Sequence, residues 1–216
     1  MQHRNLHWYA RGTLPFLAGL ILACGSKSSG PDTRELSWET VHGGFIAGAI
    51  WGVSHNDVFA VGLRGTVGHY NGANWRPMIS GLITNSSDYD VWGSSGNDVF
   101  VVGMEGSIFH YNGRTWSEME SASNTLYGVW GSSGNDVFAV GYNGTIRHYN
   151  GSEWSAMSGS PATLNYVWGS SANDVYAVGS GTLLHYDGIS WSPIDLGSAV
   201  TGLGEVWGSS RDNVYG

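Results

Sequence analysis

Cysteine and charge are both scarce in this chain of 216 residues. Cys24 is the single cysteine, so an internal disulfide is excluded. Charged residues make up 12% of the sequence and form neither basic clusters nor long runs of one sign, while the formal net charge is −8. Such a surface argues against binding to nucleic acid, whose phosphates require a basic face, and against adhesion to anionic lipid by charge alone.

Motifs for common catalytic and cofactor sites are also missing. The chain has no G-x-S-x-G, H-E-x-x-H or Cys-x-x-Cys motif and no glycine-rich phosphate loop. No segment has the apolar period of an amphipathic helix. We therefore predict no cofactor, no metal ligand and no catalytic residue within this sequence.

The first 23 residues differ from the rest of the chain. Residues 1–12 carry Arg4 and Arg11 and no acid, and residues 13–23 form an apolar run, TLPFLAGLILA. A basic head followed by an apolar run of about 7–15 residues is typical of a secretory signal peptide, whereas a permanent transmembrane helix needs about 20 apolar residues. We predict a signal peptide at 1–23, with a buried N-terminal helix as the alternative. Its removal lowers the net charge from −8 to −10.

Cys24 follows this run directly. The segment Ile21-Leu22-Ala23-Cys24 resembles the lipobox of bacterial lipoproteins, although Leu22 is bulkier than the small residue usual at that place. The resemblance implies that Cys24 is lipidated, for example with palmitate, and anchors the mature chain to a membrane. The alternative is cleavage near Ala23 that leaves an exported soluble protein. The Gly/Ser-rich segment 24–35 would form a flexible tether, and the lack of an aspartate after Cys24 implies delivery to the outer membrane, on its periplasmic or surface side.

A Trp-Gly dipeptide recurs along the rest of the chain. Successive copies are 41, 38, 38 and 39 residues apart. A fixed period of about 40 residues indicates stacked supersecondary units. The tryptophans of these pairs are Trp51, Trp92, Trp130, Trp168 and Trp207. We predict that they pack between neighbouring units and that each adjacent glycine allows a neighbouring ring or backbone to approach closely.

Each repeat contains four short strands separated by tight turns. In the copy at 126–157, LYGVWGSS and VFAVG are rich in β-branched and aromatic residues and flank a turn, SGND. Asn143-Gly144 and Asn150-Gly151 are hairpin signals, and TIRHY and EWSAM supply the other strands. Four antiparallel strands in about 40 residues form one blade of a β-propeller. Further tryptophans close the repeats: Trp75, Trp116, Trp154 and Trp191.

The repeats divide the chain after residue 35 into blades. We predict an all-β propeller at 36–216, with an isolated outer strand at 36–41, complete blades at about 47–79, 88–119, 126–157 and 164–195, and a partial blade at 203–216. The isolated strand would complete the last blade of a closed ring. An unfinished last blade would expose a strand edge, so we expect a truncated part of a larger propeller; the alternative is a native array of four and a half blades. Links such as 81–88 are places where a binding loop could grow.

Histidine and aspartate also occupy fixed places in the repeat. His69, His110, His148 and His185 precede tyrosine in the third strands, and Asp57, Asp98, Asp136 and Asp174 follow asparagine in the first turns. A ring of histidines suggests a metal site, but third strands lie too far from the axis to share one ion at about 2.0–2.1 Å. We expect the His-Tyr pair of each third strand to have one ring packed and one hydrogen-bonded near the turn. We also expect the aspartates to cap the backbone of the turn rather than to act as paired catalytic carboxylates.

Two resemblances bear on function. The segment 110–116, HYNGRTW, is similar to the Asp-box of sialidase-like propellers in the spacing of its Gly and Trp, but Asn112 stands one place late for the acid. The whole repeat, WGSS-x-N-D-V-[FY]-A-V-G followed by H-Y-[ND]-G-x-x-W, resembles repeats of exported and lipid-anchored bacterial propellers. It is more distantly similar to photosystem-assembly-factor and kelch-like propellers. These resemblances imply a fold and no single activity.

The sequence therefore predicts a binding or scaffolding module rather than an enzyme. The expected ligand is a glycan or a protein, and the expected location is the bacterial cell envelope, through the lipid on Cys24. Two alternatives are a sialidase-like or lyase-like enzyme, with its catalytic groups in further blades, and an assembly factor for an envelope complex.

Overall fold

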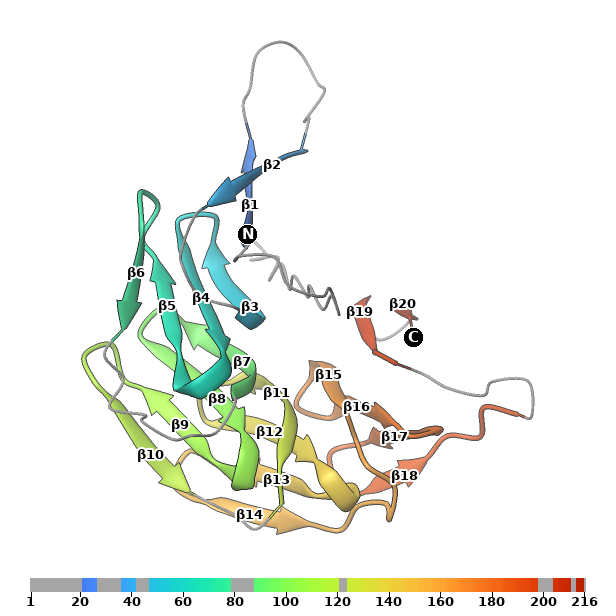
Figure 1. Ribbon diagram of the computed structural model, residues 1–216. Helices are drawn as coiled ribbons and strands as arrows, with labels where there is room; N and C mark the ends of the chain where they lie inside the picture. Colours follow the sequence, from blue (N-terminus) through green and yellow to red (C-terminus); the bar gives the residue numbers. More distant parts are fainter. Residues whose placement is uncertain are drawn as a thin grey trace.

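The structure is built from short antiparallel strands. The computed structural model describes residues 21–26, 36–41, 47–78, 88–120, 124–197, 204–210 and 213–215. These residues form four four-stranded sheets and two two-stranded sheets, and each four-stranded sheet has its strands side by side in chain order. The four-stranded sheets stand next to one another along an arc (Figure 1). This arrangement confirms the predicted all-β propeller architecture.

Each four-stranded sheet is one blade. Blade 1 comprises β3 (Ala47–Ser54), β4 (Asp57–Gly62), β5 (Val67–Tyr70) and β6 (Trp75–Met78). Blade 2 comprises β7 (Asp88–Ser95), β8 (Asp98–Gly103), β9 (Ile108–Tyr111) and β10 (Trp116–Glu120). Blade 3 comprises β11 (Leu126–Ser133), β12 (Asp136–Gly141), β13 (Ile146–Tyr149) and β14 (Trp154–Met157). Blade 4 comprises β15 (Tyr166–Ser171), β16 (Asp174–Gly179), β17 (Thr182–Tyr186) and β18 (Trp191–Pro193). The first strands of neighbouring blades contact one another and form the inner edge of the array.

Two further strand pairs accompany the blades. β19 (Trp207–Ser210) and β20 (Asn213–Tyr215) form the first hairpin of a fifth unit, and β19 contacts β15 of blade 4. β2 (Leu36–Val41) is the strand expected to complete the last blade, and its hydrogen-bonded partner in the structure is β1 (Ile21–Ser26). Its place in the last blade stays a prediction, because only the first two strands of that blade are described.

Several predicted segments lie outside the described residues. They are the signal peptide up to residue 20, the tether from residue 27 to 35 and the link at 81–87. Within the described part of the chain, no helix has the length and apolar character needed to cross a membrane.

The turn between the third and fourth strands explains the Asn-Gly repeats. In blade 2, Asn112 Oδ1 accepts the backbone N–H groups of Arg114 and Thr115, both at 3.0 Å. The intervening Gly113 has a φ of 86°, which glycine adopts without steric cost. This is an Asx turn, and it confirms the hairpin predicted at this place.

Neighbouring blades meet through the Trp-Gly pairs. Trp92 is 3% exposed, and a Cβ built on Gly131 of blade 3 would lie 2.6 Å from Trp92 Cη2. The same close approach joins Trp51 to Gly93, Trp130 to Gly169 and Trp168 to Gly208. Each buried tryptophan therefore lies on a glycine of the next blade. Trp207, which has no next blade among the described residues, is 53% exposed.

A second aromatic contact fills the outer part of each interface. Phe100 of β8 is fully buried, and its ring centroid lies 5.8 Å from that of Tyr149 and 6.3 Å from that of Trp154 in the next blade. Phe59 and Tyr111, and Phe138 and Tyr186, repeat the first of these contacts at 6.0 and 5.3 Å. Since each large ring buries about 150–250 Å², these contacts join the blades into one continuous core.

Candidate functional site

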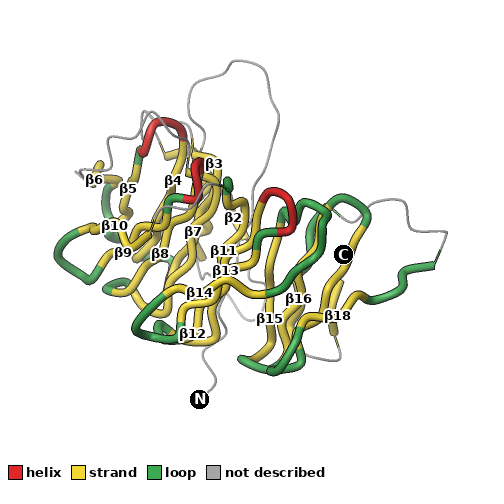
Figure 2. The backbone as a smooth tube through the Cα atoms, turned by 90° about the horizontal axis from the view of Figure 1, so that it is seen from below, coloured by secondary structure: helices red, strands yellow, loops and turns green. Residues whose placement is uncertain are grey.

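The turns of the blades lie at two ends, which we call the Asp–His face and the η face. The Asp–His face holds the turns between the first and second strands and between the third and fourth strands. These turns pack together: a Cβ on Gly113 would lie 2.9 Å from Asn97 Cβ. The η face holds the turns between the second and third strands and the links between blades. A link and a turn meet there, because Asn124 Nδ2 of the link before blade 3 donates to Thr145 Oγ1, just after the turn of that blade, at 2.9 Å. Figure 2 shows the 3-10 turns of the η face in red, on one side of the array.

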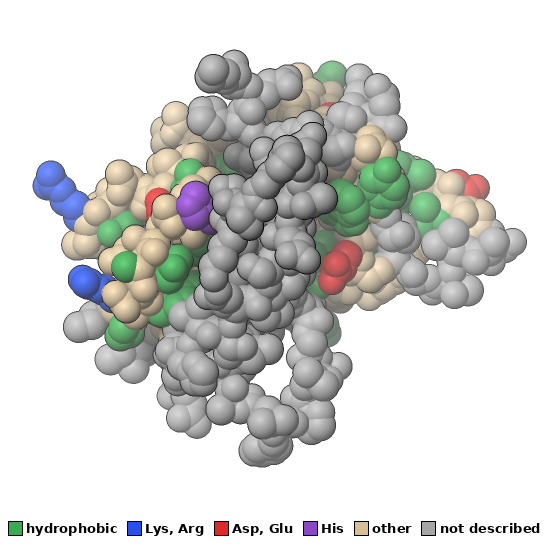
Figure 3. Space-filling model, turned by 90° about the horizontal axis from the view of Figure 1, so that it is seen from above, with side chains coloured by type: hydrophobic (Ala, Val, Ile, Leu, Met, Phe, Trp, Pro, Cys, Tyr) green, Lys and Arg blue, Asp and Glu red, His purple; other side chains and the backbone are tan. Residues whose placement is uncertain are grey.

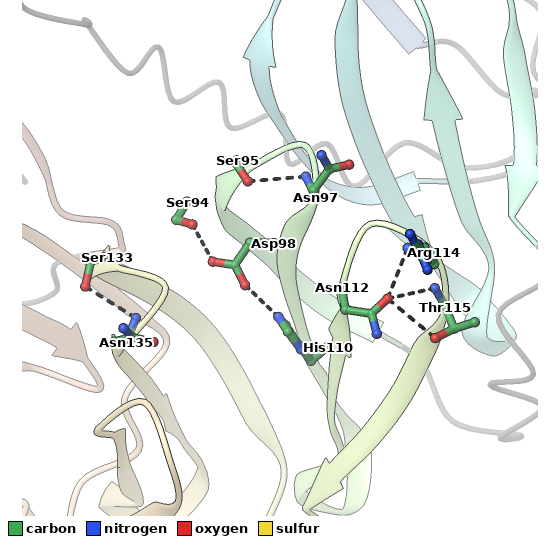
Figure 4. Close-up of polar contacts among 10 residues, drawn as sticks. All are labelled: Ser94, Ser95, Asn97, Asp98, His110, Asn112, Arg114, Thr115, Ser133 and Asn135. Atoms are coloured by element: carbon green, nitrogen blue, oxygen red, sulfur yellow. Dashed lines mark hydrogen bonds and ion pairs between the residues drawn. The ribbon is translucent and has the colours of Figure 1, made fainter.

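The Asp–His face carries a hydrogen-bonded network. In blade 2, His110 Nε2 lies 2.6 Å from Asp98 Oδ1, and Ser94 Oγ donates to Asp98 Oδ2 (Figure 4). The imidazole packs on Phe100 with ring centroids 4.5 Å apart. The hydrogen bond from His110 is the main reason why the pKa of Asp98 is lowered; burial opposes it, and the bond from Ser94 supports it.

The network recurs in blades 3 and 4 and is reduced in blade 1. The pairs His148–Asp136, His185–Asp174 and His69–Asp57 have nitrogen–oxygen distances of 2.7, 2.8 and 2.6 Å. Ser132 and Ser170 donate to the second carboxylate oxygen in blades 3 and 4, whereas Val53 takes the place of the serine in blade 1. Burial raises the pKa of the aspartates in blades 3 and 4, but the bonds from serine and histidine outweigh it, so both pKa values are lowered.

The order of the groups in this network differs from that of a hydrolase triad. In a hydrolase triad the imidazole lies between serine and carboxylate, where it can take the serine proton. Here the carboxylate of Asp98 lies in the centre, and Ser94 Oγ is bonded to it instead of to His110. The predicted His-Tyr pair with one hydrogen-bonded and one packed ring is confirmed in blade 2, where His110 bonds to Asp98 and Tyr111 packs on Phe59. Among the residues that the structure describes, no group of three His, Cys, Asp or Glu side chains is placed to hold a metal ion.

The expectation that the repeated aspartates cap the first turn is wrong. Their carboxylates bond to histidine side chains instead, and in blades 2 to 4 to serine as well, because the cross-strand register places His110 opposite Phe100, close to Asp98. The first turn is capped by Ser95, whose Oγ accepts the N–H of Asn97 at 3.3 Å (Figure 4).

The predicted structural tryptophans and Cys24 lie at separate places. The tryptophans that begin the fourth strands each pack on a tyrosine of the third strand, with centroid distances of 5.5, 5.2, 5.3 and 5.3 Å for Trp75, Trp116, Trp154 and Trp191.

Cys24, the predicted lipidation site, belongs to β1, for which the structure describes the backbone alone.

The turns of the η face carry different large side chains in different blades. In blades 1 to 3 its turns are η1 (Leu63–Gly65), η2 (Met104–Gly106) and η3 (Tyr142–Gly144). Each begins with a large apolar side chain that is exposed: 53% for Leu63, 37% for Met104 and 55% for Tyr142. The corresponding turn of blade 4, Ser180-Gly181, is one residue shorter and has no residue at this place. We call Leu63, Met104 and Tyr142 the apolar row; it was not predicted from the sequence.

Backbone strain accompanies this face. Glu105, Asn143 and Ser180 have φ values of 56°, 54° and 38°, in the left-handed region that residues with a side chain seldom adopt. The link before blade 4 holds η3 in place, because Thr163 Oγ1 accepts the N–H of Asn143 at 3.2 Å. Strained residues persist where their surroundings fix them, and such places cluster at ligand-binding sites.

Asp90 is a second feature that the sequence analysis did not single out. It is 4% exposed, and its Oδ1 and Oδ2 accept the N–H groups of Val91 and of Val129 in blade 3, both at 2.9 Å. The other complete blades have no acid here, with Ala49, Gly128 and Tyr166 two residues before their tryptophans, whereas the partial blade has Glu205, which accepts from Tyr166 Oη at 3.2 Å. An acid at this place in two of the five repeats was the available signal. Asp90 joins the inner strands of blades 2 and 3.

Comparison with solved structures agrees with this fold. YCF48 bound to D1 peptide is similar with a TM-score of 0.55 and 16% identity, over 68% of this chain and 53% of that chain. YCF48 from Cyanidioschyzon merolae gives 0.55 and 17%, over 70% and 56%. The computationally designed Ika8 protein gives 0.53 and 18%, over 63% and 44%.

These likenesses place the chain in the β-propeller class of folds. The chain spans about half the length of the structures that it matches, between 44% and 56%. No protein-family model matches the sequence, and no curated protein matches it.

Proposed function

We propose that this chain is a non-catalytic binding module that takes a protein partner through the η face. The apolar row carries the proposal, because Leu63, Met104 and Tyr142 expose large side chains at equivalent places of three adjacent blades. Exposed apolar patches of soluble proteins mark interaction sites. The Asp–His face repeats bonded side chains in every blade, so the stability of the fold accounts for it.

The chemistry of the apolar row favours a protein over a glycan. Two of its three side chains, Leu63 and Met104, offer neither a flat ring on which a sugar stacks nor strong hydrogen-bonding groups for its hydroxyls, and Tyr142 alone provides both. Methionine adapts its shape to apolar side chains of a partner. The similar YCF48 structure was determined with a D1 peptide, which supports a peptide or protein as the ligand of this propeller. An assembly factor for an envelope complex is one form of this function.

We also propose that a lipid on Cys24 holds the module at the cell envelope. The support is the basic head and apolar run before Cys24, together with the lipobox resemblance. Acyl chains contribute about 0.8 kcal/mol per buried CH₂, so two or more of them give stable anchoring without a spanning helix.

Site-specific photocrosslinking tests the binding proposal. Benzoylphenylalanine replaces Leu63, Met104 or Tyr142 in the full chain, expressed with residues 1–23 in a Gram-negative host. Ile189, which is 86% exposed on the Asp–His face, gives a matched control position. The three η-face positions should crosslink to one and the same protein, and position 189 should not. Equal crosslinking from position 189, or no protein adduct from any position of the apolar row, contradicts the proposal.

A further inference from the structure

The hairpin of β19 and β20 carries one half of the contact that joins neighbouring blades. Trp168 of blade 4 lies on Gly208 of this hairpin, so the hairpin is seated on blade 4 as a fifth unit. On its other face Trp207 and Tyr215 are 53% and 50% exposed, and their ring centroids are 4.9 Å apart. The tryptophans and phenylalanines at these places in blades 1 to 3 are at most 7% exposed. We call Trp207 and Tyr215 the ring face, because it exposes the rings that the interfaces between those blades bury.

Blade 1 carries the other half of this contact, at the opposite end of the arc (Figure 1). Its Trp51 and Phe59 contact blade 2. Since side chains alternate between the two faces of a strand, Ile50, Gly52 and Val58 lie on the opposite face, which we call the slot face. These three residues are half-buried. Their counterparts in blades 2 to 4 are all buried: Val91, Gly93 and Val99; Val129, Gly131 and Val137; Val167, Gly169 and Val175.

The ring face and the slot face complement each other. Between the described blades, a tryptophan lies on a glycine of the next blade, and a ring of the second strand packs on a third-strand tyrosine of the next blade. Blade 1 offers Gly52 and Tyr70 at these two places. Figure 3 shows apolar side chains, in green, gathered at the right of the molecule, the side on which β19 and β20 lie in Figure 1.

Gly52 is still open to a tryptophan. The atoms nearest to a Cβ built on Gly52 belong to blade 1 itself. Among the described residues, the glycine of every other Trp-Gly pair already has the tryptophan of the preceding blade beside it. The slot face of blade 1 is therefore the described surface that matches Trp207.

We propose that the ring face of one copy of this chain docks on the slot face of a second copy. Trp207 would then cover Gly52 of the second copy, and Tyr215 would pack on its Tyr70. Each large ring buries about 150–250 Å², so removal of the two exposed rings from water favours the contact. Because the two faces differ, the contact is heterologous and leaves one ring face and one slot face open in each pair, where further copies can add. The η face takes no part in this contact.

Sedimentation velocity of the full chain tests the proposal with two variants, each of which removes one face. Trp207→Ser removes the ring face, and Val58→Lys places a charge on the slot face. The unsubstituted chain should form assemblies of two or more copies that dissociate on dilution, and each variant alone should be monomeric. Tyr142→Ser is the matched control, because it removes a ring of similar exposure, 55%, from the η face and should leave the association unchanged. All variants share residues 1–23, so association through that segment would not respond to these changes.

Mixing the two monomeric variants tests whether the contact is heterologous. An equimolar mixture of Trp207→Ser and Val58→Lys should form one-to-one heterodimers, because the ring face of the second variant docks on the slot face of the first. Circular dichroism checks that each variant folds, and Ile50→Lys replaces Val58→Lys if the latter does not. A monomeric unsubstituted chain, association that survives Trp207→Ser, an equal loss in Tyr142→Ser, or a mixture that stays monomeric overturns the proposal.

Discussion

The glycines of the Trp-Gly pairs should not tolerate even one added methyl group. In Gly131→Ala the new Cβ would lie 2.6 Å from Trp92 Cη2 and 2.8 Å from the carbonyl oxygen of Asp136. Carbon atoms in good contact are about 3.5–4.0 Å apart. Trp92 is 3% exposed and Gly131 belongs to the β11–β12 ladder, so neither can move aside freely. Overpacking of this kind costs about 1–3 kcal/mol, and each kcal/mol lowers the Tm of a chain of this size by roughly 2–4 °C.

Thermal and urea unfolding, followed by circular dichroism, measure this cost against two control substitutions. At Gly204 a Cβ meets nothing within 4 Å, so Gly204→Ala should leave the stability nearly unchanged. At Gly52 the nearest atoms are Asp57 O and Val58 Cγ2, both at 3.0 Å, and no tryptophan is among them, so Gly52→Ala should fall between the other two. If Gly131→Ala is as stable as Gly204→Ala, the Trp-Gly contact does not hold the blades together.

Three further predictions concern individual side chains. The pKa values of Asp98, Asp136 and Asp174 are lowered below the ordinary 3.8. The contribution of these carboxylates to the free energy of unfolding is therefore present above that pH and is lost as pH falls through the lower folded-state pKa values. A midpoint of urea unfolding that stays constant from neutral to strongly acidic pH would contradict this prediction. Asp90→Ala leaves the buried N–H of Val129 without its acceptor and should cost about 1–3 kcal/mol in urea unfolding; Asp90→Asn should cost less, and equal losses would refute this role. Cys24→Ser should abolish incorporation of labelled palmitate in cells, and label that persists would rule out the anchor.

Local residue patterns predicted the blades because the relevant contacts are short-range or repeated. Asn112-Gly113 forms its turn with residues two and three places away, and the Trp-Gly period recurs in every blade. The Asp98–His110 bond, in contrast, spans 12 residues and depends on the register of β8 and β9. An aspartate beside a turn is ordinarily a cap, so the pattern alone gave the wrong partner.

The apolar row and Asp90 were missed for a different reason. Leu63 and Met104 follow the apolar second strands in the sequence, and the structure shows that they begin 3-10 turns in which their side chains are exposed. Asp90 lies in an inner strand among residues that vary between repeats, and its role depends on a backbone N–H of the next blade. Exposure and contacts between blades depend on tertiary packing, which the period of the repeat does not specify.

The affinity of the crosslinked partner for η-face variants tests the central claim most directly. The full chain with Leu63→Ser/Met104→Ser/Tyr142→Ser is compared with Ile189→Ser by biolayer interferometry. Burying a large apolar side chain contributes about 1.5–3 kcal/mol, so loss of the apolar row should raise the Kd at least about a hundredfold. Ile189→Ser should leave the Kd unchanged. An unchanged Kd in the triple variant would contradict binding through the η face.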